Sequence, residues 1–166
     1  MGAFVGVVVG SKSDVGVMQE CIETLERFGA AYEMIIASAH RTPDRVAAYI
    51  EEAEAAGAGA FIAAAGMAAH LAGAIAARTT KPVIAVPIAN GALNGVDALL
   101  SSAQMPPKIP VACVAINGAI NAAYLAVQIL ALSDPELARK LLDDRQSVRV
   151  QAEIDSRPLE VRLSRR

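Results

Sequence analysis

AFVGVVV at residues 3–9, followed at once by GSKSD at residues 10–14, is the stretch of sequence that decides the fold. An unbroken apolar run is typical of a strand buried on both faces of a parallel sheet, because a strand with one wet face alternates with polar residues. Residues 14–28 then carry apolar side chains at helical spacing and end before Gly29, which predicts a helix with a glycine stop. The stretch thus predicts the first strand–helix unit of an α/β domain.

The same alternation of a short apolar run and a longer helical stretch continues along the chain. Four more strands are predicted, at residues 32–37, 59–64, 82–86 and 110–116. The helices after them are predicted at residues 42–56, 68–79, 95–102 and 119–132. Thr42 is expected to be the N-cap of the helix that Pro43 begins. Five such units with short connections predict a flavodoxin-like three-layer sandwich, with helices on both faces of a parallel β-sheet.

A charged, amphipathic helix is predicted to begin at Asp134-Pro135 and to continue past Arg145 as a C-terminal extension. No further strand is predicted after it, so we expect this helix to reach a neighbouring subunit. Residues 1–155 are predicted to form a single α/β domain that includes the helix. Residues 156–166 are polar and basic, and we expect a loose tail there.

The composition excludes several classes of protein. Hydrophobic residues make up 54% of the 166 residues and charged residues 19%, which excludes a disordered chain. The mean hydropathy of +0.40 is high for a soluble monomer, yet no apolar run reaches the roughly 18 residues of a membrane helix, so we expect an oligomer and no membrane partner. The net charge of −2 argues against a nucleic-acid surface.

The N-terminus and the cysteines indicate a reducing, cytoplasmic location. The first residues have no basic segment ahead of an apolar one, so no signal peptide is expected. Cys21 and Cys113 stand alone in the sequence, without a CxxC pair. Each is interpreted as a small buried hydrophobic residue rather than as a redox or zinc-binding group.

The polar residues of the chain gather in the loops that follow the predicted strands, at residues 10–14, 38–42, 66–70 and 87–95. In open parallel sheets, ligands bind at the carboxyl ends of the strands. Both histidines of the chain, His40 and His70, fall in these loops. We therefore expect a functional site at this edge of the sheet.

The first loop leads into a helix N-terminus, where free N–H groups and the helix dipole favour an anion. Ser11 and Ser13 add hydroxyl donors, although the loop is neither a Walker A sequence nor GxGxxG. Two interpretations stay open: these residues cap the helix, or they hold a phosphate. In the second case Asp14 would accept hydrogen bonds from ribose hydroxyls, since a carboxylate beside a phosphate would repel it.

His40 directly follows the second predicted strand and precedes Arg41. An imidazole can give and take a proton near neutral pH, and a guanidinium can bind phosphate with two parallel hydrogen bonds. The alternative is a loop histidine that caps a carbonyl, with Arg41 as a surface charge. His70 is expected to cap a helix or line the site, because two histidines without nearby carboxylates make a poor metal site. No metal and no cofactor are expected.

Six short motifs together resemble the bacterial N5-carboxyaminoimidazole ribonucleotide mutase family of purine biosynthesis, the catalytic subunit type of phosphoribosylaminoimidazole carboxylase. The first three are Gly-Ser-Lys-Ser-Asp at 10–14, Ser-Ala-His-Arg-Thr-Pro at 38–43 and Ala-Ala-His-Leu-Ala-Gly at 68–73. Leu-Asn-Gly-Val-Asp at 93–97, Gln-Met-Pro at 104–106 and Asn-Ala-Ala at 121–123 continue the match in the same order. The resemblance covers roughly residues 3–145.

This resemblance implies a flavodoxin-like homo-octamer, with active sites at subunit contacts and a C-terminal helix that packs on neighbouring subunits. It implies an isomerase that moves the carbamate carboxyl of N5-carboxyaminoimidazole ribonucleotide from the exocyclic amine to the ring carbon, without ATP or metal. It also implies a functional link to the ATP-dependent synthetase that makes this substrate. The expected partners are thus the nucleotide substrate and further copies of the chain.

The resemblance also implies roles for individual residues. His40 would be the general acid and base, which protonates the ring carbon as CO₂ leaves the nitrogen and removes that proton after CO₂ adds to carbon. Further positions would bind the nucleotide or line the site around it. These are Ser11, Ser13, Asp14, Ser38, Ala39, Arg41, Gly66, Ala68, His70 and Leu71.

Two positions depart from the family pattern. Met67 stands where a second glycine is usual, and Pro107-Lys108 stands where Arg-Gly is common. If position 67 needs a positive φ or a close backbone approach to the carboxyl group, methionine strains or narrows the pocket.

Three alternatives to the mutase stay open. A related branch carboxylates aminoimidazole ribonucleotide directly with CO₂, but it tends to show Ser-Ala-His-Lys where this chain has Arg41. A divergent paralogue would carboxylate a different ring. A non-enzymatic nucleotide-binding or scaffold protein would need no proton-transfer group, and the presence of His40 argues against it.

Overall fold

The computed structural model describes residues 2–156. Within them the strands form one parallel sheet in the order β2-β1-β3-β4-β5, the order of flavodoxin-like folds. The strands are β1 (Phe4–Val9), β2 (Tyr32–Ile36), β3 (Ala58–Gly66), β4 (Val83–Ile88) and β5 (Ala112–Cys113). The predicted fold class is confirmed.

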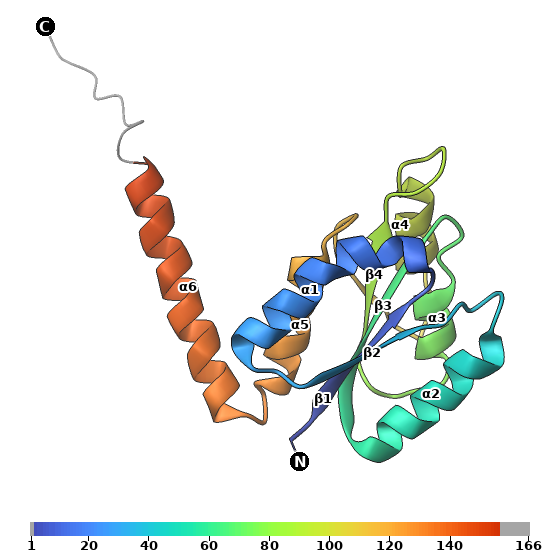
Figure 1. Ribbon diagram of the computed structural model, residues 1–166, viewed down its shortest axis with the longest axis horizontal. Coiled ribbons are helices and arrows are strands. Elements are labelled where there is room, and N and C mark those ends of the chain that lie inside the picture. Colours follow the sequence, from blue (N-terminus) through green and yellow to red (C-terminus); the bar gives the residue numbers. More distant parts are fainter. Residues whose placement is uncertain (1, 157–166) are drawn as a thin grey trace, which may run out of the picture.

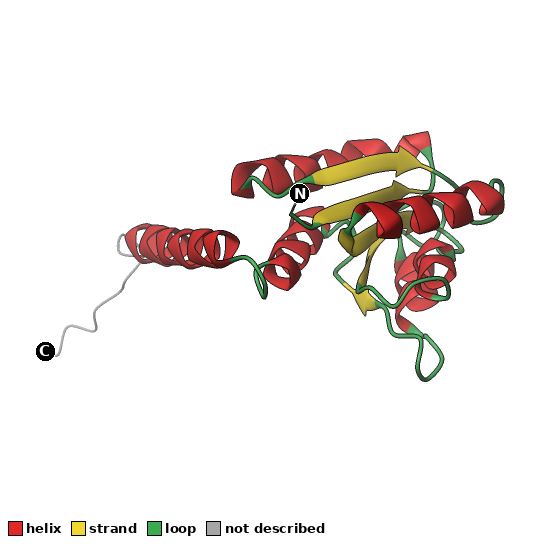
Figure 2. Ribbon diagram, turned by 90° about the horizontal axis from the view of Figure 1, so that it is seen from below, coloured by secondary structure: helices red, strands yellow, loops and turns green. Residues whose placement is uncertain are grey.

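Helices cover both faces of the sheet (Figures 1 and 2). Besides a 3₁₀ turn at Lys12–Asp14, they are α1 (Val15–Phe28), α2 (Pro43–Ala56), α3 (Leu71–Ala76), α4 (Val96–Ala103), α5 (Ala119–Leu130) and α6 (Pro135–Ser156). Side chains of α1 and α5 form one apolar core with the sheet, and side chains of α2 and α3 form a second core on the opposite face. The body is therefore the expected three-layer sandwich.

The inner strand β1 lies between β2 and β3 and contributes to both cores, because its side chains alternate between them. Val5, Val7 and Val9 are fully buried against α1 and α5, while Val8 is buried against α2 and α3. Each fully buried valine stabilises the fold by about 1.5–3 kcal/mol relative to exposure. Gly6 has no side chain because the Phe61 ring fills its place, 2.7 Å from where a Cβ would stand. The apolar run in the sequence is thus unbroken because β1 is buried on both faces of the sheet, as expected.

Several predicted boundaries are wrong, and local backbone geometry explains them. The strands β3 and β4 each run two residues further than predicted, to Gly66 and Ile88. The helix predicted at residues 68–79 spans only Leu71–Ala76, because Met67 has a φ of 55° and residues up to His70 form a loop. The strand predicted at 110–116 keeps only Ala112–Cys113. Beyond it, Asn117 N–H donates to the Pro87 carbonyl at 2.8 Å as the chain turns toward α5.

Thr42 occupies the N-cap position of α2, but its side chain does not cap the helix. Its hydroxyl instead donates to the Ser38 carbonyl at 3.2 Å and accepts from the Ser38 N–H at 2.9 Å. The expected capping bond is therefore replaced by a closed turn over residues 38–42. That turn fixes the backbone that presents His40.

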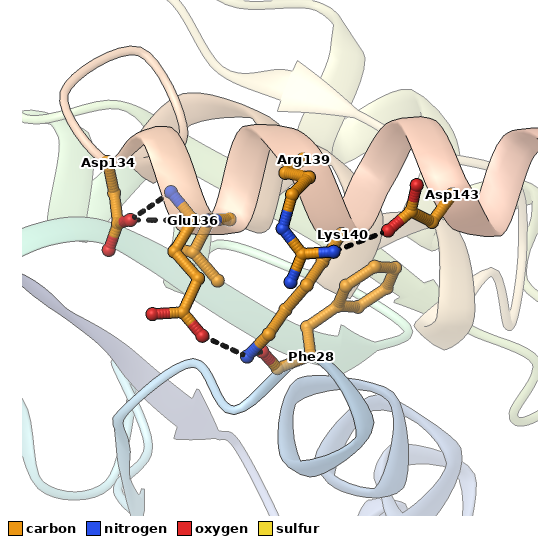
Figure 3. Close-up of polar contacts among 7 residues, drawn as sticks. Phe28, Asp134, Glu136, Arg139, Lys140 and Asp143 are labelled. Carbon is orange, nitrogen blue, oxygen red and sulfur yellow. Dashed lines mark hydrogen bonds and ion pairs between the residues drawn. The ribbon is translucent and has the colours of Figure 1, made fainter.

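The last helix, α6, projects away from the α/β body (Figure 1) and continues past Arg145 to Ser156, as the sequence predicts. Asp134 caps its first turn by accepting from the Glu136 N–H at 2.9 Å (Figure 3). Lys140 anchors the helix to the body by donating to the Phe28 carbonyl at 2.8 Å. Beyond these contacts its apolar side chains are exposed at Leu142, Val148, Val150 and Ile154. The loose tail is predicted to begin at Ser156, but Ser156 is the last residue of α6. The other tail residues, 157–166, lie outside the described part of the chain.

None of the helices formed by residues 2–156 is both long enough and apolar enough to cross a membrane.

Candidate functional site

A cavity of about 440 Å³ lies at the carboxyl edge of the sheet, at the ends of β1 to β4. Its lining combines backbone from strand ends with side chains from the loops that follow them. The residues that line it are Gly10, Ser11, Ser13, Asp14, Ser38, Ala39, His40, Arg41, Ala65, Gly66, Met67, Ala68, His70, Leu71 and Asn90. All of the site residues predicted from the sequence are in this set, so the fold brings them together in one place.

Asp14 is the buried charged group of the site, with only 3% of its surface exposed. Its Oδ1 accepts hydrogen bonds from Ser13 Oγ and from Asn90 Nδ2, each at 2.9 Å. These donors offset the cost of removing a carboxylate from water. Both bonds use the same oxygen, which leaves Oδ2 for a donor from outside the protein.

The capping interpretation of the first loop is correct for one residue and wrong for another. Ser11 Oγ accepts from the Ser13 N–H at 3.4 Å, so Ser11 caps the short 3₁₀ turn, and the hydroxyl oxygens of the two serines lie 3.0 Å apart. Asp14 holds the N-cap position of α1 without a side-chain capping bond. Its carboxylate is instead directed to Ser13 and Asn90, on the side where the cavity lies.

His40 and His70 come from different loops and lie beside each other in the cavity. Their ring centroids are 5.3 Å apart and the rings are tilted by 42°. Both side chains are exposed, and among residues 2–156 no hydrogen bond ties the His40 ring to a carbonyl. The carbonyl-capping alternative for His40 is therefore not what the structure shows, and its ring is free to meet a ligand.

Arg41 ties two of the site loops together. Its guanidinium Nη2 donates to the Gly10 carbonyl at 3.2 Å, and its backbone N–H donates to Ser38 Oγ at 3.2 Å. The side chain remains exposed, so further N–H donors of the fork face solvent. An anion in the cavity would thus meet a guanidinium already oriented by the first loop.

The strand end at Gly66 and Met67 has an unusual backbone. A Cβ at Gly66 would lie 2.5 Å from Asn90 Nδ2, so only glycine lets the Asn90 amide approach Asp14 over this strand end. Met67 has a φ of 55°, which costs a non-glycine residue about 1–2 kcal/mol. Methionine is expected from the sequence to be strained if position 67 needs a positive φ, and the structure shows that the position has one. Lys108, at the second departure, also has a positive φ, of 76°.

Asn90 is a site residue that the sequence interpretation did not select. It lies in the loop after β4, which the sequence does mark as part of the site, two residues beyond the end of a buried apolar strand. A polar residue at that point was the available signal. Its contact with Asp14 spans 76 positions of sequence and could not be read from either loop alone.

A second, larger hollow of about 800 Å³ lies near the amino ends of β4 and β5. Its charged lining residues are Glu54, Arg78, Lys81 and Lys108, and neither histidine borders it. The larger hollow therefore lies at the amino edge of the sheet, whereas the histidines that could transfer protons lie at the carboxyl edge. The larger hollow is the weaker candidate for catalysis, because its lining offers no histidine for acid–base steps near neutral pH.

Metal-binding and thiol chemistry have little support from the geometry. Within residues 2–156, no group of three or more His, Cys, Asp or Glu side chains is arranged to hold a metal ion. Cys21 lies on the core-facing side of α1 and is fully buried, and burial raises the pKa of its thiol to about 12. Cys21 thus behaves as the small buried hydrophobic residue that the sequence predicts, whereas Cys113 is only partly buried.

Known proteins of one family are similar to this chain over most of its length. The AIR carboxylase family model matches residues 4–151. The N5-carboxyaminoimidazole ribonucleotide mutase of Pyrococcus abyssi is 52% identical over 145 residues, which cover 87% of this chain and 83% of that protein. The Bacillus subtilis protein of the same name is 47% identical over 151 residues, covering 90% and 93%.

The fold comparison agrees with the sequence comparison. A crystal structure of Treponema denticola PurE superposes with a TM-score of 0.88 at 31% identity, covering 96% of this chain and 99% of that one. The family match spans all the strand ends and loops that build the cavity. The chain belongs to the AIR carboxylase family.

Proposed function

We propose that the chain is an N5-carboxyaminoimidazole ribonucleotide mutase, an isomerase of purine biosynthesis that forms 4-carboxy-5-aminoimidazole ribonucleotide. The observation that carries this proposal is the gathering of His40, Arg41 and Asp14 in one cavity at the carboxyl edge of the sheet. Relatives of that name share about half of their residues with this chain. The cavity thus supplies a proton-transfer group, a cation and a buried acceptor to a phosphorylated ligand.

The first two loops bind the ribose phosphate in this proposal. Ser11 offers its hydroxyl group to the phosphate oxygens, and Arg41 offers the free donors of its guanidinium. Ser13 lines the same wall of the cavity, but its hydroxyl already donates to Asp14. Asp14 accepts from the ribose hydroxyls through Oδ2, because Oδ1 already accepts from Ser13 and Asn90. The phosphate lies away from Asp14, since two anions would repel each other across a buried site.

His40 moves the proton that the reaction requires. The substrate carries a hydrogen on the ring carbon, and the product carries an additional hydrogen on the amine, so one proton must reach the amine side and one must leave the carbon. When CO₂ departs, the electrons of the N–C bond stay with the nitrogen, which accepts a proton from His40 and becomes the free amine. The ring carbon then forms a bond to CO₂, and His40 removes the proton from that carbon.

The apolar part of the lining keeps CO₂ in place between the two steps. Ala39, Ala65, Ala68 and Leu71 border the cavity and offer no hydrogen bonds from their side chains to water. Exclusion of water suits a bound CO₂, which would otherwise be lost to hydration. Neither ATP nor a metal has a role in this scheme, and the carboxyl group stays with its own nucleotide.

The assembly and location follow from the same proposal. The enzyme is a cytoplasmic homo-octamer whose α6 helices pack on neighbouring subunits, and it takes its substrate from an ATP-dependent synthetase. The exposed apolar side chains on α6, among them Leu142 and Val148, support the packing, because contact with a neighbouring subunit would remove them from water. The free cysteines Cys21 and Cys113 are compatible with a reducing compartment.

Turnover with two alternative substrates tests the proposal. Purified wild-type protein receives N5-carboxyaminoimidazole ribonucleotide without ATP or added bicarbonate, and in a parallel reaction aminoimidazole ribonucleotide with bicarbonate. We expect the carboxylated product from the first substrate, with a rate independent of bicarbonate. Product only in the second reaction would identify a direct carboxylase instead. No product in either reaction, despite nucleotide binding, would contradict the enzymatic proposal.

A further inference from the structure

Met67 is an apolar side chain in an unusual backbone position at the wall of the cavity. Its φ of 55° holds the residue in the left-handed region, and 59% of its surface is exposed. Its neighbours Gly66 and Ala68 also line the cavity. A side chain that is strained and exposed contributes little packing to the fold itself, so its role is to be sought in the cavity.

The Met67 side chain extends from the loop after β3 to the loop after β4. A Cβ placed on Gly91 would lie 3.5 Å from Met67 Cγ and 3.9 Å from both Sδ and Cε, which is ordinary van der Waals contact. Gly91 follows Asn90, the residue that donates to Asp14. Met67 therefore spans the gap between the two loops on the side of the cavity where Asn90 lies.

The distribution of polar groups indicates which part of a ligand meets Met67. Hydroxyl, guanidinium and carboxylate groups come from the loops at residues 10–14 and 38–42. The loop after β3 contributes glycine, alanine, leucine and methionine, with His70 as its only titratable side chain in the lining. The uncharged, heteroaromatic end of the ligand is thus expected on the Met67 side, where a thioether can pack against a ring.

We propose that Met67 is a specificity-determining residue that covers the heteroaromatic ring and the CO₂ released beside it. This inference rests on the proposed function. Burial of the exposed thioether by the ring favours binding, and the side chain closes the gap toward Gly91 through which CO₂ would otherwise leave. Its removal should raise the KM roughly two- to tenfold, as expected for one sulfur–aromatic contact. Removal should also raise the fraction of turnovers that end as aminoimidazole ribonucleotide and free CO₂.

Three variants at position 67 separate the side chain from the backbone. Met67→Gly removes the side chain and relieves the positive φ, so this variant is expected to fold. Met67→Ala removes the thioether but keeps a Cβ at that φ, and Met67→Leu keeps most of the apolar volume. We expect the ratio of decarboxylated to isomerised product to rise at least threefold in the glycine and alanine variants. The leucine variant should stay within twofold of wild type.

Lys108→Gly is the matched control. It relieves a second positive φ, of 76°, at a residue that borders the other hollow and not this cavity. The product ratio of this variant should equal that of wild type. A change with Met67→Gly but not with Met67→Ala would assign the effect to the backbone and overturn the inference. Unchanged ratios in both variants would overturn it as well.

Failure of the proposed function gives a different result from failure of this inference. If wild-type protein does not turn over the carbamate substrate, the function is wrong, and the contact is then measured by calorimetric binding of aminoimidazole ribonucleotide. Weaker binding to Met67→Ala than to wild type, by more than twofold, with Lys108→Gly unchanged, would support the contact. Equal binding to wild type and Met67→Ala would overturn it.

Discussion

Both edges of the sheet carry charged side chains, but the two edges differ in how those side chains are held. At the carboxyl edge Asp14 is buried, accepts from two protein donors and lies in one cavity with His40 and Arg41. At the amino edge Lys81 and Lys108 are exposed residues around a larger hollow. Cavity size alone therefore does not identify a functional site, whereas a buried polar group held by hydrogen bonds is a better indicator.

Parallel topology explains why the two edges differ. Each strand end at the carboxyl edge leads into the start of a helix, so loops from β1 to β4 converge on one space. The amino edge receives the C-terminal ends of helices instead. Small residues are needed where loops converge, and Gly66 meets this need beneath the Asn90 amide.

The largest expected effect is the loss of proton transfer at the carboxyl edge. His40→Asn keeps a polar side chain of similar size but cannot give and take a proton near neutral pH. We expect kcat for the isomerisation to fall by about a hundred- to ten-thousandfold, the range of general acid–base catalysis. Steady-state kinetics measure this effect, and substrate binding by calorimetry should change little. An active His40→Asn enzyme would refute the assignment.

The next effect concerns the buried acceptor. Asn90→Ala removes one of the two donors to Asp14 Oδ1, which leaves the carboxylate less well oriented. Hydrogen bonds to charged groups are worth about 1.5–3 kcal/mol, so we expect KM to rise about tenfold or more while kcat stays within a fewfold of wild type. A split of this kind between KM and kcat would show that Asn90 acts through Asp14. Equal losses in both constants would contradict that role.

A smaller effect is expected on stability at the strand end. Gly66→Ala places a Cβ 2.5 Å from Asn90 Nδ2, and the side chain must move away. We expect a loss of about 1–3 kcal/mol in the free energy of unfolding, measured by urea denaturation.

Gly16→Ala is the control for that loss, because Gly16 lies in α1 and a Cβ there meets no atom within 4 Å. Alanine favours the helix, so the control should be stabilised by up to about 1 kcal/mol. Equal stability of the Gly66→Ala and Gly16→Ala proteins would show that the Asn90 contact is not tight.

The smallest effect belongs to the amino edge. Lys81→Ala removes an exposed cation from the rim of the larger hollow. We expect kcat and KM to remain within twofold of wild type, since the hollow takes no part in the reaction. A tenfold change in either constant would break the distinction between the two edges.

The sequence predicts the fold and the membership of the cavity because both depend on local patterns. An apolar run such as residues 3–9 identifies a buried strand, and the polar loop after it identifies one wall of the site. Asn90 and the loop at Met67 depend on contacts between distant segments, which no single stretch of sequence contains. The late start of α3 follows from one left-handed residue, and helical spacing in the sequence does not reveal it.

Thr42 shows the same limit on a small scale. Its identity and the following Pro43 correctly predict where α2 begins. The partner of its hydroxyl is the Ser38 backbone rather than the helix, because the turn over residues 38–42 closes on itself. Element positions are thus more readily predicted than the bonds that hold them.

Hydrogen exchange at the ring carbon is the most direct test of the central claim that His40 transfers a proton at the carboxyl edge. Aminoimidazole ribonucleotide is incubated with the enzyme in D₂O, and NMR follows the loss of the ring-carbon proton signal. The account predicts that wild-type protein and Lys81→Ala accelerate the exchange equally, while His40→Asn leaves it at the rate without enzyme. Exchange by His40→Asn at the wild-type rate would contradict the claim.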